Sequence, residues 1–123
     1  MQQPKDQVQS LLQKAKELNE KEEYQQALEY YEEAKTLLDK EDIDNDCSLH
    51  AEVYEGMARS KFFLGEYEES KRYALQALIV RRKYFGKESI EIAKAYYDLA
   101  FVYIELSRYD MALYCLKRTL TIR

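Results

Sequence analysis

The chain has 123 residues, of which 46% are hydrophobic and 34% are charged, a mixture typical of a single globular domain rather than of a disordered segment. Its net charge of −4 disfavours nucleic-acid binding, which calls for an excess of basic residues. Only 3 Gly and 1 Pro interrupt the sequence, and so few backbone breakers disfavour a many-turned β protein and predict an all-α fold.

Six amphipathic segments follow one another along the chain. Apolar residues recur in them at intervals of three and four, which is the spacing of one face of a helix. The pattern predicts helices over residues 5–20, 24–39, 47–64, 67–84, 89–106 and 109–123. Short joints at 21–23, 65–66 and 107–108 alternate with longer ones at 39–46 and 85–88. We therefore expect six helices that pack in consecutive antiparallel pairs.

One arrangement of small and large residues occurs three times. The first segment contains Leu11, Ala15, Leu18, Tyr24, Ala27, Tyr31 and Ala34. The second contains Tyr54, Met57, Ala58, Gly65, Tyr67, Ser70, Ala74 and Ala77, and the third contains Tyr96, Leu99, Ala100, Tyr103, Tyr109, Ala112, Leu116 and Thr119. With Ala27, Ser70 and Ala112 as matching positions, the spacings are 43 and 42 residues. Small residues let two helices approach closely, so this period predicts a stack of helical hairpins.

These residues resemble the tetratricopeptide repeat family over about residues 8–123. The family pattern is kept best in the third segment, at Tyr96, Leu99, Ala100, Tyr103 and Ala112. The usual period of the family is about 34 residues. The longer period here, and the stretch 77–86 that runs into Ile92-Ala93 and residues 98–100, look like the repeats of kinesin-light-chain-type proteins.

The resemblance implies an all-α fold, namely a right-handed α-solenoid of three helix-turn-helix repeats with six antiparallel helices. The repeats are expected at about residues 5–39, 47–84 and 89–123 of a single domain, 1–123. Stacked repeats normally finish with a polar cap, whereas the last helix here carries several leucines. We therefore expect this chain to be a fragment of a longer repeat array.

Catalytic, cofactor and metal sites are not indicated by the sequence. Cys47 and His50 are three residues apart, but a structural zinc site needs four ligands, and the only other thiol is Cys115. The three glycines lie far apart, so no phosphate-binding loop is present. The abundant paired carboxylates are expected to form solvated helix faces. We predict no enzyme, no cofactor and no metal site.

In tetratricopeptide repeats the first helix of each pair lines a concave groove, and the resemblance implies groove residues at matching positions. In the first repeat they are Gln9, Leu12, Lys16, Asn19 and Glu20. In the second they are Glu52, Glu55, Arg59, Phe62 and Phe63, and in the third they are Lys94, Tyr97, Asp98, Phe101, Ile104 and Glu105.

Aromatic residues among charges are the usual composition of a binding hot spot, which draws attention to Phe62, Phe63, Tyr97 and Phe101. Burial in the core is an equally weighted alternative for Phe62 and Phe101. The expected function is that of a non-catalytic adaptor or scaffold that presents the groove to a peptide or helix of a partner protein.

Two other functions stay open. The repeats are suited to stacking on other repeats or on a second copy, and Leu113, Leu116 and Leu120 of the last helix then form the self-association face of a homodimer. Alternatively, the chain is the regulatory domain of an enzyme whose catalytic part is absent.

One specialisation of the family is not expected here. Members that grip the C-terminal carboxylate of chaperones use Lys, Asn and Arg at set positions of the inner helices. The matching residues are Leu12, Lys16, Gly56, Lys94 and Asp98, and only Lys94 agrees.

The location of the protein is predicted from what the sequence lacks. Its start does not have the layout of a secretion signal, and no apolar stretch approaches the ~20 residues of a membrane span. Two cysteines are too few for a disulfide framework. We expect a cytoplasmic protein, and the resemblance to kinesin light chains implies a cytoskeletal or transport-associated setting.

Overall fold

The computed structural model describes residues 3–41, 48–86 and 88–122. Over these ranges the chain forms helices α1 (Pro4–Glu20), α2 (Tyr24–Glu41), α3 (Ser48–Phe63), α4 (Tyr67–Phe85), α5 (Ile90–Glu105) and α6 (Tyr109–Ile122). Each helix begins and ends close to the residues that the apolar spacing predicts. The all-α prediction is therefore confirmed for the part of the chain that the structure describes.

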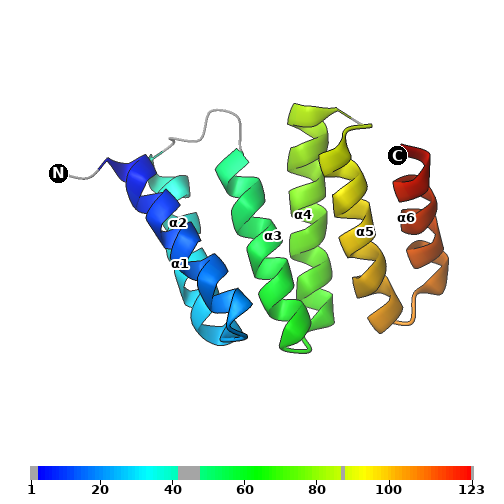
Figure 1. Ribbon diagram of the computed structural model, residues 1–123, viewed down its shortest axis with the longest axis horizontal. Helices are drawn as coiled ribbons and strands as arrows, with labels where there is room; N and C mark the ends of the chain where they lie inside the picture. The colour runs from blue at the N-terminus through cyan, green and yellow to red at the C-terminus, as the bar shows by residue number, and fades with distance from the viewer. Residues whose placement is uncertain (1–2, 42–47, 87, 123) are drawn as a thin grey trace.

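The helices pack in consecutive antiparallel pairs. The closest packing lies within the hairpins α1–α2, α3–α4 and α5–α6. Neighbouring hairpins meet through α2 and α3, through α4 and α5, and more lightly through α1 and α3. The hairpins follow one another in a row from the N-terminus to the C-terminus (Figure 1). This arrangement is the expected solenoid, and it makes α1, α3 and α5 the inner helices of successive hairpins.

The three joints within the hairpins share one backbone geometry. Glu22, Gly65 and Ser107 all have a positive φ, of 64°, 81° and 59°. One residue further on, the backbone N–H of Glu23, Glu66 and Arg108 donates to a carbonyl in the preceding helix at 2.8–2.9 Å. This bond satisfies an end-of-helix carbonyl in the manner of a glycine C-cap. Only the second joint has the glycine that such a turn favours, so helix packing imposes the conformation on the other two.

The predicted small residues lie where the helices of a hairpin touch. Ala27, Ser70 and Ala112 at the start of the second helices are all buried. The hydroxyl of Ser70 donates to the carbonyl oxygen of Ala58 on α3 at 2.7 Å, so a polar side chain fits this contact without an unpaired group. Small side chains at these positions are thus what allows each hairpin to close.

Candidate functional site

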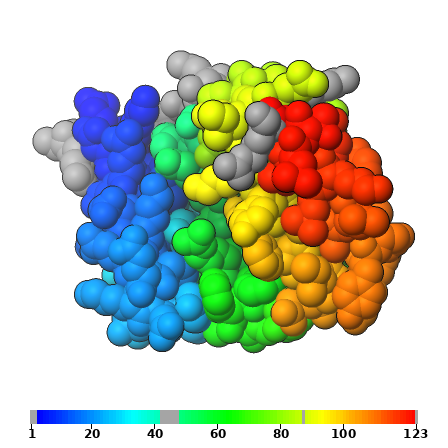
Figure 2. Space-filling model, turned by 45° about the vertical axis from the view of Figure 1, so that its right-hand side comes forward, coloured from blue at the N-terminus to red at the C-terminus, as the bar shows by residue number. Residues whose placement is uncertain are grey.

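The inner helices α3 and α5 place five of the predicted groove residues around one hollow. Figure 2 shows the surfaces of α1 in blue, α3 in green and α5 in yellow to orange next to one another on one face. Between α3 and α5 lies a hollow of about 380 Å³. It is lined by Ala58, Arg59, Phe62, Phe63, Ser70, Ala74, Asp98, Phe101 and Val102, and is called the α3–α5 hollow below. Five of the predicted groove residues are therefore brought together.

Aromatic rings on α3 form one wall of the α3–α5 hollow. Phe62 is half-buried and meets the ring of Tyr67 edge to face, with the two centroids 5.4 Å apart. Phe63 is 57% exposed and stacks on the ring of Tyr24, with centroids 5.0 Å apart and the planes 13° from parallel. Ring contacts of this kind hold aromatic side chains in place, so this wall is largely formed in advance of any ligand.

The facing wall on α5 is aromatic as well. Phe101 lines the α3–α5 hollow and meets the ring of Tyr97 edge to face at 5.0 Å. Both side chains are exposed to nearly half of their full extent. The alternative that Phe101 is a core residue is thus not what the structure shows, and Tyr97 lies beside the hollow rather than in its lining.

Opposite charges from the two walls face the α3–α5 hollow. Arg59 belongs to α3 and Asp98 to α5, and neither forms a hydrogen bond or a salt bridge with any residue that the structure describes. Loss of solvent raises the pKa of Asp98, while the positive charges of Arg59 and Lys94 act against this rise. The hollow therefore offers a ligand one hydrogen-bond donor group and one acceptor group with no partner among the described side chains.

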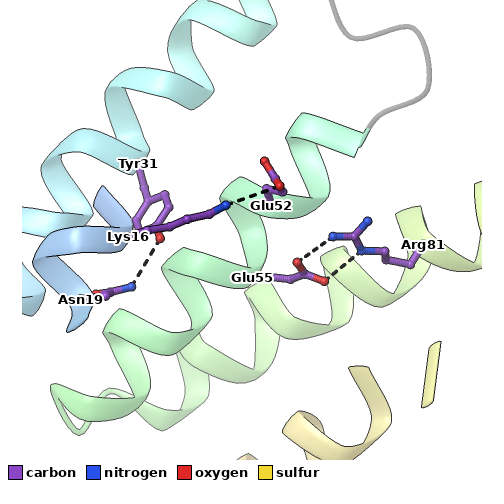
Figure 3. A network of polar contacts seen from close by, with 6 residues as sticks. All are labelled: Lys16, Asn19, Tyr31, Glu52, Glu55 and Arg81. Atoms are coloured by element: carbon purple, nitrogen blue, oxygen red, sulfur yellow. Dashed lines mark hydrogen bonds and ion pairs between the residues drawn. The ribbon is translucent and has the colours of Figure 1, made fainter. Parts of the chain in front are cut away.

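Three predicted groove residues, Lys16, Glu52 and Glu55, are instead engaged with neighbouring helices (Figure 3). The ammonium of Lys16 on α1 lies 3.5 Å from the carboxylate of Glu52 on α3. Glu55 accepts two hydrogen bonds from Arg81 of α4, at 2.8 and 3.0 Å, and this contact raises the pKa of Arg81. These side chains therefore link helices of the stack. Lys94, the predicted basic groove residue of α5, is exposed.

The junction between α1 and α3 is closed by a buried polar group, called the α1–α3 seam below: Asn19, Tyr31, Gly56 and Ser60. Ser60 donates to the amide oxygen of Asn19 at 2.7 Å, and the Asn19 amide nitrogen donates to the Tyr31 hydroxyl at 3.5 Å and the Gly56 carbonyl at 3.4 Å. Burial raises the pKa of Tyr31 to about 12. A Cβ on Gly56 would overlap the Tyr31 ring, so the glycine is what lets this ring approach α3.

The α1–α3 seam corrects two predictions for the first repeat. Leu12 and Asn19 are buried, so neither is available to a partner. The spacing within one helix could not show this, because the groups that cover Asn19 come from α2 and α3. A glycine inside a predicted helix, Gly56, is the one local sign of close packing at this place.

The last helix presents an apolar face. Leu113 and Leu120 of the predicted self-association face are 53% and 74% exposed, whereas Leu116 is half-buried against the core around α5. Tyr109 and Tyr114 of the same helix are also exposed. Tyr109 lies one turn before Leu113 and extends this face, whereas the ring of Tyr114 meets that of Tyr96 on α5.

The cysteine and histidine side chains considered for metal binding do not form a cluster among the described residues. Cys47 lies outside the described residues, and the His50 ring nitrogen lies 3.3 Å from a carboxylate oxygen of Asp39. Cys115 is buried in α6, where loss of solvent raises its pKa to about 11. Over the three described ranges no group of three or more His, Cys, Asp or Glu side chains is arranged to hold a metal ion. None of the helices in these ranges is long and apolar enough to cross a membrane.

Comparison with protein families gives two matches. One family model described as "Tetratricopeptide repeat" matches residues 49–123, and a second with the same description matches residues 8–37. The first match alone covers more than half of the chain. A comparison with curated proteins finds no match.

Comparison with solved structures finds similar folds at low identity. BtubC (BKLC) from P. vanneervenii is 22% identical with a TM-score of 0.92, over 100% of this chain and 48% of that one. The TPR domain of Arabidopsis FLU is 19% identical with a TM-score of 0.84, over 97% and 96%. TPR-like repeats of a kinesin-light-chain-type protein from Podospora anserina are 18% identical with a TM-score of 0.82, over 99% and 57%. The chain thus spans about half the length of the first of these proteins.

Proposed function

We propose that this chain, which belongs to the tetratricopeptide repeat family, acts as a non-catalytic protein-binding module. In this proposal the α3–α5 hollow receives a peptide or helical segment of a partner protein. Domains of this family generally mediate protein interactions, and the chain shares their paired-helix fold. The observation that carries the proposal is the hollow itself, in which aromatic walls surround two charged groups that form no hydrogen bond or salt bridge with the described residues.

The shape and chemistry of the α3–α5 hollow support this function. Its volume of about 380 Å³ falls in the range of about 300–1,000 Å³ that is usual for ligand pockets. Aromatic anchors and an arginine are the groups that most often dominate binding energy at protein interfaces. Because ring contacts already hold Phe62 and Phe63, a ligand would bear less of the entropy cost of ordering this wall.

A comparison of variants tests the proposal. Tagged wild-type chain and the Phe101→Ala variant are used to capture proteins from cells, and the captured proteins are quantified. Ile79→Ala serves as the control, because Ile79 is 64% exposed and does not line the hollow. We expect Phe101→Ala to lose partners that Ile79→Ala retains, with equal helical content in all three chains. Identical captured sets from the two variants would contradict the proposal.

A second candidate function is association through α6, and the helix register favours it. Helices α2, α4 and α6 begin at Tyr24, Tyr67 and Tyr109, so equivalent positions lie 43 and 42 residues apart. Leu120 is then equivalent to Leu78, and Leu113 to Leu28. Leu78 and Leu28 are both buried in clusters with residues of the next hairpin. Each exposed leucine of α6 therefore matches a leucine that one of the two earlier helices buries, which suits a further hairpin or a second copy. The equivalent residues in the other helix are Lys35 in α2 and Lys71 in α4.

The opposite end of the stack differs. Gln7 and Ser10 of α1 are exposed, and their equivalents Ile92 and Val53 are buried. We expect association at the α6 end alone, so light scattering at rising concentration should show dimers rather than longer chains. The double variant Leu113→Glu and Leu120→Glu should be a monomer. A wild-type chain that stays monomeric at high concentration would remove this candidate.

A further inference from the structure

We infer that the α3–α5 hollow is the open form of a cleft, which closes when the α5–α6 hairpin turns toward α3 and Arg59 forms an ion pair with Asp98. The closed form would leave no room for a partner. The movement can be measured without any partner, whereas its consequence for binding rests on the proposed function. Three features of the molecule carry the inference: the attachment of α5, the composition of the two walls, and the charges that face each other across the hollow.

The inner helices are not all fastened to one another in the same way. Helix α1 packs directly on α3, where Ser60 donates to the amide oxygen of Asn19 at 2.7 Å. Helix α5 is joined to α3 mainly through α4. In the described part of the chain, no hydrogen bond or salt bridge links the lining residues of the hollow on α3 to those on α5. The first two hairpins are therefore held together across the inner face, and the third is not.

The contact between α4 and α5 is apolar and can act as a pivot. Leu78 of α4 is buried in a cluster with Ile92 and Leu99 of α5. Apolar contacts are non-directional, so two helices can turn relative to one another while such a contact persists. The joint after α4 begins with Gly86, whose φ of 85° a glycine adopts without strain, and hinges are usually a few loop residues of this kind. The closely packed helices α5 and α6 can therefore turn as one body.

Closure would bury apolar surface that now meets water. Phe101 on the α5 wall is 45% exposed, and Phe62 on the α3 wall is half-buried. The hollow is also lined by the small side chains of Ala58, Ser70 and Ala74, which leave space for the two walls to approach. Removal of the aromatic carbon surface from water favours the closed form.

Arg59 and Asp98 are placed to pair with each other. The acidic residue one turn before Arg59 on α3 is Glu55, which already accepts two hydrogen bonds from Arg81. Burial raises the pKa of Asp98, and the charge of Arg59 opposes this rise more strongly than does Lys94 on Asp98's own helix. A turn of the α5–α6 hairpin that shortens the separation across the hollow would bring the guanidinium and the carboxylate together as a charge-assisted pair.

A partner and the closed form compete for the same space. A segment that fills the hollow binds the open form only, so its affinity is reduced by the fraction of molecules that are closed. An ion pair between partly exposed groups shifts such an equilibrium by up to about 5-fold. The Arg59–Asp98 pair therefore weakens binding without preventing it.

Distances between spin labels test the movement. Labels are attached to Glu20→Cys on α1 and Glu105→Cys on α5, two exposed positions on either side of the inner face, after Cys47→Ser and Cys115→Ala remove the native thiols. Double electron–electron resonance on the full chain then measures the distance, which closure shortens. Labels at Glu20→Cys and Gln76→Cys are the control, because both positions belong to the first two hairpins and should keep one distance throughout.

Charge reversal shows whether the ion pair causes the closure. Arg59→Asp and Asp98→Arg should each lengthen the α1–α5 distance and lower the ratio of closed to open molecules by about 5-fold or more, because like charges then face each other. The double variant carries the reversed pair and should restore the wild-type distance. Arg72→Asp, which makes the same charge change at an exposed position of α4 outside the hollow, should leave the distance unchanged. Where a single reversal disturbs folding, the wild-type chain in about 1 M salt gives a second measure, since screening should also lengthen the distance.

The outcomes distinguish the closure from the proposed function. An α1–α5 distance that is the same in wild type, in both single reversals and at high salt overturns the closure and leaves the proposed function standing. Distances that respond as expected, in a chain whose Phe101→Ala variant captures the same proteins as Ile79→Ala, support the closure and overturn the proposed function.

Discussion

The α1–α3 seam and the α3–α5 hollow are equivalent places that the chain uses in different ways. In the seam, Tyr31 reaches from α2 across to Gly56 on α3, and Asn19 and Ser60 satisfy the polar atoms around it. In the hollow, Ala74 leaves the same place open between aromatic walls. The helix packing differs as well, because α1 packs directly on α3, whereas α3 and α5 are joined mainly through α4. Ala74 stands in place of Tyr31 and Asp98 in place of Gly56, and these exchanges together with the helix packing separate a closed junction from an open one.

The two junctions should also differ in how much they contribute to the stability of the folded state. A buried aromatic ring contributes several kcal/mol to the folded state, and the α3–α5 hollow forgoes this contribution. The first junction should therefore dominate the stability of the stack, while changes in the second should mainly affect binding. The following variants and conditions test this difference between the two junctions, from the largest expected effect to the smallest.

Replacing Tyr31 by alanine should have the largest effect. The ring is 2% exposed, and its removal should lower the free energy of unfolding by about 3–5 kcal/mol. Urea unfolding followed by circular dichroism measures this loss. The matched control is Tyr109→Ala, because this ring is 64% exposed and should change stability by less than about 1 kcal/mol. Equal losses in the two variants would show that the seam has no special role.

Alkaline pH should have the second-largest effect, because it should lower the free energy of unfolding that the α1–α3 seam contributes. Burial raises the pKa of Tyr31 from its ordinary value of 10.0 to about 12, so the folded state favours the neutral phenol. The resulting stabilisation is complete below pH 10 and is lost as the pH rises from 10 to about 12. This loss should amount to about 2–3 kcal/mol of unfolding free energy.

The control for the pH experiment is Tyr31→Phe, which has no group to titrate at this place. Cys115, whose pKa is also raised by burial, is present in both chains and cancels in the comparison. The two unfolding curves should converge between pH 10 and 12. A constant difference over this range would mean that the Tyr31 hydroxyl is not buried in solution.

Substitution of Gly56 should be costly only while Tyr31 is present. A new Cβ at Gly56 overlaps the Tyr31 ring, and overpacking of this kind costs about 1–3 kcal/mol. The gain in helix propensity from Gly to Ala returns at most about 1 kcal/mol, so Gly56→Ala should be destabilising. In a Tyr31→Ala background the overlap is gone, and the same substitution should become stabilising. Absence of this reversal in urea unfolding would contradict the packing argument.

The helices and their order could be predicted from the sequence because both depend on local spacing. The positions of the joints follow from the repeat period. Glu22 and Ser107 are not residues that favour a turn, and helix packing imposes the positive φ that they adopt. The partners of Lys16 and Glu55 could not be predicted, since Arg81 lies 26 residues from Glu55 and no short pattern connects them.

The site depends on a difference between repeats, whereas a repeat search finds what they share. Tyr31 and Ala74 both belong to the recurring pattern, and the pattern alone gives no sign that one closes a junction and the other leaves it open. Five of the predicted groove residues of α3 and α5 do line the hollow, because one inner-helix position recurs on the same face. Only the fold shows what lies opposite each of them.

Lys16 provides the smallest and most discriminating test. It holds the same inner-helix position as Arg59 and Phe101, which line the hollow, but its ammonium faces Glu52 at 3.5 Å across the α1–α3 seam. Both side chains are partly exposed, so Lys16→Ala should change the free energy of unfolding by less than about 1 kcal/mol, and less still at high salt. Lys16→Ala should retain the proteins that the wild-type chain captures, whereas Arg59→Ala should lose them. Loss of captured proteins in Lys16→Ala with unchanged stability would place the binding site nearer to α1 and contradict the proposed difference between the two junctions.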